Sequence, residues 1–401
     1  MHHGTKLVVA ALALAWPGAL PSLYAAVDPP GSLVRTAALE SLNGPDEVVR
    51  VAAIHVLGRI GTAGDVPRLA ELATTGGSDA LREAAFESLV AMRRPQIDAA
   101  LLAQLKTAKP RTRATLIRCL AERRPRDALP AVLQRAEDED AEVRLEAFKA
   151  LQVLADTESV PALIALLVKS TPGEERESAE LAMCAACRRI TDHQRQADPL
   201  LAALVGADVP QRCALLPVLG RVGGRDALGV VRAARSDAHA EVAEAAIRAL
   251  CNWPDADVAT ELFAIAKDGS KPQHRSWAVR ALARVIPRAD DRTPQERTLL
   301  LQQTMTLARQ ADDKRLVLSR LAAVRTPEAL ATALSSTADP ELRGEAIKAV
   351  VELARGLWKS HPQAAREALE KVLRITTDRE LRGRIDRILG NPEQARKGQG
   401  N

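Results

Sequence analysis

The stretch "EVRLEAFKALQVLADTESVPALIALL", residues 142–167, holds two apolar runs on either side of a polar turn. In the first run, Val143, Ala147 and Leu151 recur at the spacing that gathers side chains into one stripe on an α-helix. Pro161 follows the turn and suits the first turn of a second helix, where its missing N–H needs no partner. Neither helix can bury its apolar stripe alone, so the stretch predicts a helix hairpin that packs against further copies of itself.

The outline of this hairpin recurs along the chain. In each copy a basic residue precedes an aliphatic residue or Met by seven positions, and consecutive copies start 29 to 39 residues apart. The pairs are Arg50/Leu57, Arg82/Leu89, Arg113/Leu120, Arg144/Leu151, Arg176/Met183, Arg212/Leu219, Arg275/Leu282, Lys314/Leu321, Arg343/Val350 and Arg382/Leu389, and Ala243/Leu250 keeps the spacing without the charge. A repeat of this period predicts an all-α fold, an α-solenoid of about eleven helix hairpins.

The repeated residues resemble those of HEAT repeats, in the short form that the phycobilisome-lyase-like repeats share. The stretch "DEVVRVAAIHVLGRIGTAGDVPRLAELA" (46–73) carries the resemblance, and "ADDKRLVLSRLAAVRTPEAL" (311–330) is similar to HEAT arrays of secreted bacterial proteins. The resemblance implies stacked helix hairpins whose second helices line a concave surface. It also implies that the basic residue seven positions before each aliphatic anchor bonds to the acidic turn of a neighbouring repeat, which is a structural role.

The two ends of the chain differ from the repeats. Residues 1–25 start with a weakly positive segment, continue with an apolar run and end in small residues, which predicts a cleaved signal peptide and an exported, periplasmic or extracellular bacterial protein. The HEAT-like solenoid is predicted at residues 26–390, and residues 391–401 are predicted to form a disordered tail. No run reaches the roughly 18 apolar residues of a membrane helix, so stable membrane insertion is not expected.

The sequence offers no set of residues for catalysis. It lacks a His-Glu dipeptide, a GxSxG motif and a phosphate-binding glycine loop, so the prediction is a non-enzymatic protein with no metal and no cofactor. Cys184 and Cys187 form a CxxC pair within a helical pattern rather than at a helix start, which favours buried small residues over a redox site. The pairing of the five cysteines cannot be read from the sequence.

The candidate site is a ladder of side chains two positions before each anchor. These residues are His55, Glu87, Arg118, Lys149, Leu181, Pro217, Arg248, Arg280, Ser319, Lys348 and Arg387, and six of the eleven are basic. On the expected concave face they form a broken basic ladder, and we take Arg118, Lys149, Arg248, Arg280, Lys348 and Arg387, together with Trp277 beside Arg280, as candidate partner-binding residues. The competing interpretation is that Lys and Arg are good helix formers on any solvated face.

Two functions fit this pattern. The first is a scaffold that binds another protein, whose identity the sequence does not give, through the concave surface. The alternative is a groove for an anionic polymer, either nucleic acid or acidic polysaccharide. A net charge of only +5 over 401 residues, 2% aromatic residues and the predicted export disfavour a nucleic-acid partner. The oligomeric state is not specified by the sequence.

Overall fold

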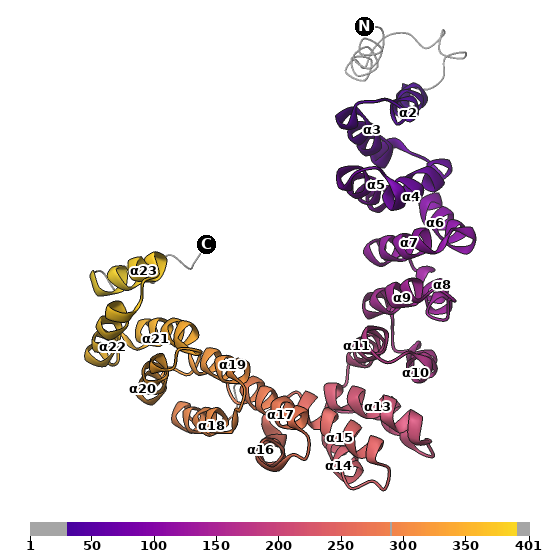
Figure 1. Cartoon of the computed structure of the whole chain (residues 1–401). Helices are drawn as coiled ribbons and strands as arrows, with labels where there is room; N and C mark the ends of the chain where they lie inside the picture. The colour runs from indigo at the N-terminus through magenta and orange to yellow at the C-terminus, as the bar shows by residue number, and fades with distance from the viewer. Residues whose placement is uncertain (1–29, 289–290, 391–401) are drawn as a thin grey trace. The chain divides into compact units, whose positions relative to one another are not determined.

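The computed structural model describes residues 30–288 and 291–390, so the predicted signal peptide and the predicted C-terminal tail lie outside the described residues. Over these ranges the chain forms twenty-two α-helices and four short 3-10 helices, with no strand (Figure 1). The described residues form two compact units, which divide between Pro199 and Leu200. The all-α prediction is therefore confirmed.

The helices of the first unit are α2 (Pro30–Ser41), α3 (Glu47–Ile60), α4 (Val66–Thr75), α5 (Asp79–Ala91), α6 (Pro95–Thr107), α7 (Pro110–Arg123), α8 (Ala128–Arg135), α9 (Ala141–Leu154), α10 (Val160–Lys169) and α11 (Glu174–Arg188). Helix α12 (Asp198–Leu204) crosses the boundary between the units. The second unit holds α13 (Val209–Val222), α14 (Arg225–Ala234), α15 (Ala240–Asn252), α16 (Ala259–Asp268), α17 (Pro272–Val285), α18 (Pro294–Leu307), α19 (Ala311–Leu321), α20 (Pro327–Ser335), α21 (Arg343–Leu357), α22 (Pro362–Ile375) and α23 (Arg379–Gly390). The 3-10 helices are η3 (Ala63–Asp65), η4 (His193–Arg195), η5 (Ala256–Val258) and η6 (Ser336–Ala338).

Consecutive helices pair as hairpins, five in the first unit from α2/α3 to α10/α11 and five in the second unit from α14/α15 to α22/α23, where about eleven were predicted. In the first unit the odd-numbered helices stack in sequence, α3 on α5, α5 on α7, α7 on α9 and α9 on α11. In the second unit α13, α15, α17, α19, α21 and α23 stack in the same way. The even-numbered helices lie against this layer, for example α4 against α5 and α16 against α17. Each unit is thus a stack of helix hairpins.

Local sequence explains where the odd-numbered helices begin. The Asp140 carboxylate accepts a hydrogen bond from the backbone N–H of Glu142 at 2.9 Å and caps α9, and Asp46 caps α3 in the same way. Asp208 and Gln211 form a reciprocal capping box at the start of α13. The even-numbered α10 carries Pro161 in its first turn, as predicted.

The predicted anchors form the interface between hairpins. From Leu57 to Val350, all ten of these side chains are buried. Leu389 is only half-buried, and Ile385 and Ile388 take the buried positions of α23 instead. The predicted frame is therefore off by one residue in the last described helix, whose outer side has no following hairpin among the described residues to cover it.

Glycine allows close approach at two of these helix contacts. A Cβ atom added to Gly58 of α3 would lie 2.8 Å from the Ser88 hydroxyl of α5, and one added to Gly220 of α13 would lie 2.3 Å from the Ala249 carbonyl oxygen of α15. Within the described residues, none of the helices combines the length and apolar character that a membrane span requires.

Candidate functional site

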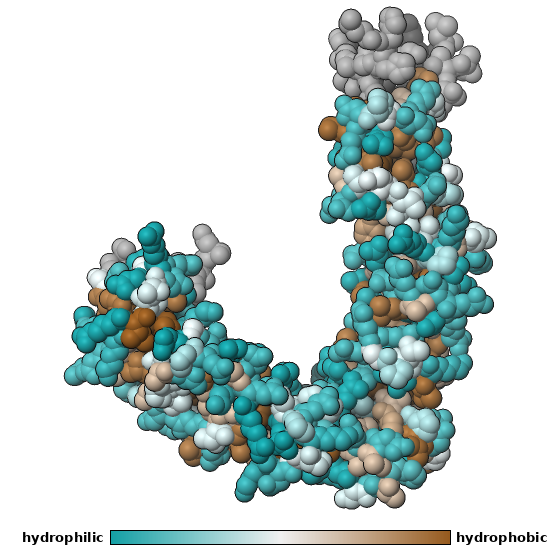
Figure 2. Space-filling view, viewed as in Figure 1, coloured by the Kyte–Doolittle hydropathy of each residue, from teal (hydrophilic) through white to brown (hydrophobic). Residues whose placement is uncertain are grey.

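The seven candidate residues lie in both units, all of them on odd-numbered helices. Arg118 and Lys149 lie on α7 and α9 of the first unit, and the other five belong to the second unit. All of the ladder positions are exposed except Arg248, which is half-buried, and Pro217, which is buried inside α13. The prediction that position 217 faces solvent is wrong, because α13 lies very close to α15 at the neighbouring Gly220. Figure 2 shows that hydrophilic side chains cover most of the surface in view.

In the first unit, the ladder is part of a chain of contacts that crosses four helices. The Arg118 guanidinium lies over the Phe86 ring of α5, 5.6 Å from its centre, and its Nε is 4.0 Å from Glu146 of α9. The Lys149 ammonium lies 3.2 Å from Glu146 and 3.2 Å from Glu174 at the start of α11. Burial lowers the pKa of Lys149, but the hydrogen bonds to Glu146 and Glu174 outweigh this effect and keep that pKa above its usual value. Acidic residues thus neutralise both cations.

In the second unit, Arg280 of α17 has a structural partner. Its Nε donates to the Asp313 carboxylate of α19 at 2.7 Å, and the Ser276 hydroxyl donates to the other oxygen of that carboxylate at 2.7 Å. Asp313 is 98% buried, since only 2% of it is exposed, and a carboxylate this deeply buried needs such partners. The half-buried ring of Trp277 stacks on the buried His274 ring with centroids 5.6 Å apart. Arg280 therefore links α17 to α19, and Trp277 is committed to a ring contact.

The other three candidates also make local contacts. Lys348 lies 3.5 Å from Glu345 one turn earlier in α21, and Arg387 donates from Nε to the Gly383 carbonyl oxygen at 3.1 Å. Arg248 is also not free of partners. The basic ladder predicted from the sequence is consequently a face of mixed charge. The sequence signal for this is the acidic residue three positions before two of the ladder lysines, Glu146 and Glu345.

Three of the ten basic residues seven positions before the anchors make the bond that was predicted, to an acidic residue of a neighbouring repeat. Arg113 lies 2.8 Å from Asp138, Arg144 lies 3.0 Å from Glu175, and Arg212 pairs with Asp237, so three arginines reach the acidic turn that follows in sequence. The same position also makes a bond that was not predicted, to the carbonyl oxygen six residues earlier, at or just after the end of the preceding helix. Examples are Arg82 to Gly76, Arg144 to Asp138, Arg275 to Gly269 and Arg382 to Thr376.

Sequence reasoning missed a second set of structural arginines at the C-terminal ends of odd-numbered helices. Arg123 at the end of α7 donates from Nη1 to the Leu89 carbonyl oxygen at 2.8 Å and pairs with Asp98 at 2.6 Å. Arg284 near the end of α17 donates to the Trp253 carbonyl oxygen at 2.7 Å. Burial, and then the nearby charge of Arg288, lower the pKa of Arg284. These arginines cap the preceding odd-numbered helix, and a basic residue two or three positions after the anchor is the signal for them.

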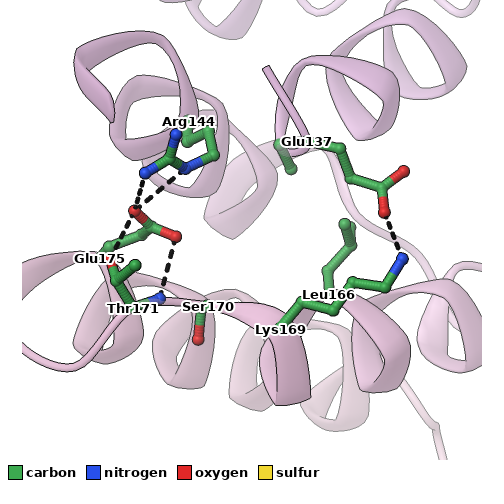
Figure 3. Close-up of a pocket in the computed structure, with 8 residues that line it drawn as sticks. Glu137, Arg144, Leu166, Lys169, Ser170, Thr171 and Glu175 are labelled. Carbon is green, nitrogen blue, oxygen red and sulfur yellow. Dashed lines mark hydrogen bonds and ion pairs between the residues drawn. The ribbon is translucent and has the colours of Figure 1, made fainter. Parts of the chain in front are cut away.

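One shallow pocket lies between the turns at residues 136–139 and 169–175 (Figure 3). Its polar side chains satisfy one another: Arg144 holds Glu175, the Thr171 hydroxyl donates to Glu175 at 2.8 Å, and Lys169 lies 2.6 Å from Glu137. Burial raises the pKa of Glu175, but the hydrogen bonds from Arg144 and Thr171 have the larger combined effect and bring that pKa below its usual value. The carboxyl therefore stays ionised and is a poor general acid. The contacts that line the pocket thus stabilise the turns around it.

The cysteines are poorly suited to chemistry. Cys184 and Cys187 are buried in α11 as predicted, and no disulfide joins the five cysteines in the part of the chain that the structure describes. Burial raises the pKa of Cys119 and Cys251 to about 12 and that of Cys187 to about 11, so these thiols are protonated at neutral pH and are weak nucleophiles. Within the part of the chain that the structure describes, no three His, Cys, Asp or Glu side chains could hold a metal ion together.

The sequence and the fold were compared with known families and solved structures. A profile for HEAT repeats matches residues 99–184, 197–283 and 229–303. No curated protein matched the sequence. Among solved structures, the karyopherin Kap121p bound to the extreme C-terminus of the protein phosphatase Cdc14p is 13% identical, with a TM-score of 0.50, over 97% of this chain and 48% of that chain. Kap121p bound to the SUMO protease Ulp1p is 14% identical with a TM-score of 0.50 over the same shares.

Kap95p in its structure with RanGDP is 13% identical, with a TM-score of 0.51, over 97% of this chain and 55% of that chain. The protein spans about half the length of these karyopherins, and identities this low establish the fold alone. The repeated hairpins, the buried anchors and the matched segments agree: the protein is a HEAT-repeat protein, with the repeats matched at residues 99–184 and 197–303.

Proposed function

We propose that the protein is an exported, non-enzymatic scaffold that binds another protein through the exposed face of its odd-numbered helices. In a HEAT array this face is expected to be concave and to offer a long surface for a partner. The observation that carries the proposal is the chain of contacts from Phe86 through Arg118, Glu146 and Lys149 to Glu174. It supplies an aromatic ring and both signs of charge on four adjacent helices, and the exposed Leu181 lies on the same face of α11.

A face of this kind suits a protein surface better than a polyanion. Each cation of the first unit's ladder already has a carboxylate partner, so an anionic polymer would have to displace that partner or suffer repulsion from it. The karyopherin Kap121p, which shares the fold, has been solved bound to the extreme C-terminus of Cdc14p and bound to Ulp1p, so HEAT arrays can hold other proteins. The anionic-polymer alternative remains the second candidate, because six of the eleven ladder positions are basic.

Site-specific photo-crosslinking tests which face meets the partner. A photoreactive amino acid would replace Leu181 of α11, and a matched control would replace Val230 of the even-numbered α14, since these side chains are 37% and 38% exposed. Crosslinking in the native envelope should join a partner at position 181 and none at position 230. Equal yields at both positions, or a product at 230 alone, would contradict the proposed face.

Export is a separate part of the proposal and has its own test. It is supported by the leader-like composition of residues 1–25. Amino-terminal sequencing of the protein from its native source should give a chain that begins at Ala26. A cytoplasmic protein that retains Met1 would refute export and leave the interaction face untouched.

A further inference from the structure

Two neighbouring turns of the first unit carry exposed arginines that the proposed function does not use. The turn between α5 and α6 holds Arg93 and Arg94, and the turn between α7 and α8 holds Arg124 and Arg126. We name these four residues the arginine edge. All four are exposed, and within the described part of the chain none of their side chains makes a hydrogen bond or an ion pair. This sets them apart from the ladder cations, each of which has a local contact.

Arg123 holds the two turns side by side. Its Nη1 donates to the carbonyl oxygens of Leu89 at 2.8 Å and Val90 at 2.9 Å, and its Nη2 lies 2.6 Å from Asp98 in the first turn of α6. The end of α7 is thereby fixed against the end of α5. The two turns that carry the four arginines therefore belong to one region, at the C-terminal ends of two packed helices, where the helix dipoles favour positive charge.

The backbone of Arg124 supports a role for its side chain. Its φ of 51° and ψ of 48° are left-handed, and it is the only residue other than glycine with positive φ among the described residues. The remaining positive-φ positions are Gly173, Gly206, Gly223 and Gly224. Glycine adopts this conformation at no steric cost and is the usual residue just after a helix, whereas an L side chain is strained there. A charged side chain is thus present at a position where the backbone conformation favours glycine, which has no side chain.

The surroundings limit what the arginine edge can bind. Glu122 and Asp127 are exposed beside it, and the next turn of the same kind, between α9 and α10, carries Asp156 and Glu158. A long polyanion that followed the helix ends past α7 would meet these carboxylates. A short anionic segment would meet only the arginines, whose planar forks match carboxylate groups.

We propose that the arginine edge is a docking site for a short segment of a partner protein that is rich in Asp and Glu. The arginine edge lies at the helix ends, away from the face of the ladder, so this site and the face of the odd-numbered helices can succeed or fail independently. A partner could use both surfaces, with its body on the helix face and an acidic tail on the arginine edge.

The test uses the full chain and a defined probe. Fluorescence anisotropy would measure binding of a labelled peptide of about ten residues in which Asp and Glu alternate with Gly and Ser. The variant Arg124→Gly/Arg126→Ser removes two charges of the arginine edge. The control Lys109→Ser/Arg111→Ser removes two exposed charges at the opposite end of the same helix, α7. We expect the first variant to raise the Kd about fivefold or more, as the loss of two exposed ion pairs allows, and the control to leave it within about twofold.

The thermal unfolding midpoint is a second measurement. If Arg124 had a structural role, Arg124→Gly would lower this midpoint. Because glycine relieves the left-handed backbone, Arg124→Gly should leave the thermal unfolding midpoint unchanged or raise it. Equal peptide binding by the variant and the wild type would overturn the proposal, as would equal loss in the control or a lower unfolding midpoint for Arg124→Gly. Tighter binding of a thymidine oligonucleotide of the same charge than of the peptide would reassign the site to nucleic acid and also overturn it.

Discussion

Gly220→Ala and Gly229→Ala make the same chemical change in two consecutive helices, and the structure predicts opposite effects on stability. Gly220 lies in α13 against α15, and an added Cβ would lie 2.3 Å from the Ala249 carbonyl oxygen and 2.5 Å from the Ala249 Cα. Gly229 lies in α14, is exposed, and has no atom within 4 Å of an added Cβ. Since both residues are helical, the gain in helix propensity is shared and the difference reports the contact.

The magnitudes follow from these distances. Replacing a helical glycine with alanine stabilises a helix by about 0.5–1 kcal/mol, which is the whole expected effect at Gly229. At Gly220 the opposing atoms are backbone and cannot rotate away, so α13 and α15 must separate by about 1 Å and lose dispersion contacts along their buried interface. Overpacking of this kind costs about 1–3 kcal/mol, which leaves a net loss of up to about 2.5 kcal/mol after the propensity gain.

Urea unfolding followed by far-ultraviolet circular dichroism measures both variants, with the slope of the transition compared as well as its midpoint. Gly220→Ala should unfold at lower urea and Gly229→Ala at higher urea than the wild type. The reasoning would be refuted if both variants shifted the midpoint upward by the same amount, because α13 and α15 would then not approach as closely as described.

Three further predictions use the same measurement. Leu151→Ala should lower the free energy of unfolding by about 2–5 kcal/mol, because this fully buried anchor lies between hairpins; a loss near zero would contradict the repeat frame. Arg280→Ala should cost about 1–3 kcal/mol, because it removes one of two partners of the buried Asp313 carboxylate, and an unchanged midpoint would show that the ion pair is only a surface contact. Glu175 has a pKa below its ordinary value of 4.5 in the folded protein, so it stabilises the fold above that pH and loses this effect as the pH falls through its folded pKa. Glu175→Gln should therefore be less stable than the wild type at neutral pH, and the difference should vanish once the pH has fallen below the folded pKa of Glu175; a difference that persists in strong acid would exclude the pairing of Glu175 with Arg144 as its source.

Much of the fold could be predicted from the sequence because the information is local and repeated. Apolar spacing gives the stripe of each helix, and ten anchors between Leu57 and Val350 are buried where that spacing places them. Asp140 and Pro161 mark the starts of α9 and α10, and each signal depends only on a few neighbouring residues in the sequence. The prediction fails at Leu389, where burial depends on a following hairpin rather than on the helix itself.

The candidate site was harder to predict because it depends on contacts between hairpins. The ladder was chosen by position alone, and position does not show that Glu146 of α9 reaches Arg118 of α7. Similarly, the ion pair of Arg280 with Asp313 joins residues 33 positions apart, a separation that varies along an array with uneven repeat lengths. Pro217 was placed on the exposed face by the frame, but a close helix contact buries it. Charge pairing between neighbouring helices therefore has to be read from the structure.

Recurrence itself separates structural from functional residues in an array of this kind. A residue that returns at the same position of every hairpin meets the same neighbour each time, because each hairpin contacts only adjacent ones. Arg113, Arg144 and Arg212 illustrate this, since each bonds to an acidic turn and so maintains the stacking. A binding site has to differ from hairpin to hairpin, since a partner recognises one stretch of the array. Arg124 meets this condition: it departs from the glycine that the other positive-φ positions use, and its exposed side chain makes no hydrogen bond or ion pair among the described residues. The residues that break the repeat, rather than those that define it, are accordingly where we expect partners to bind.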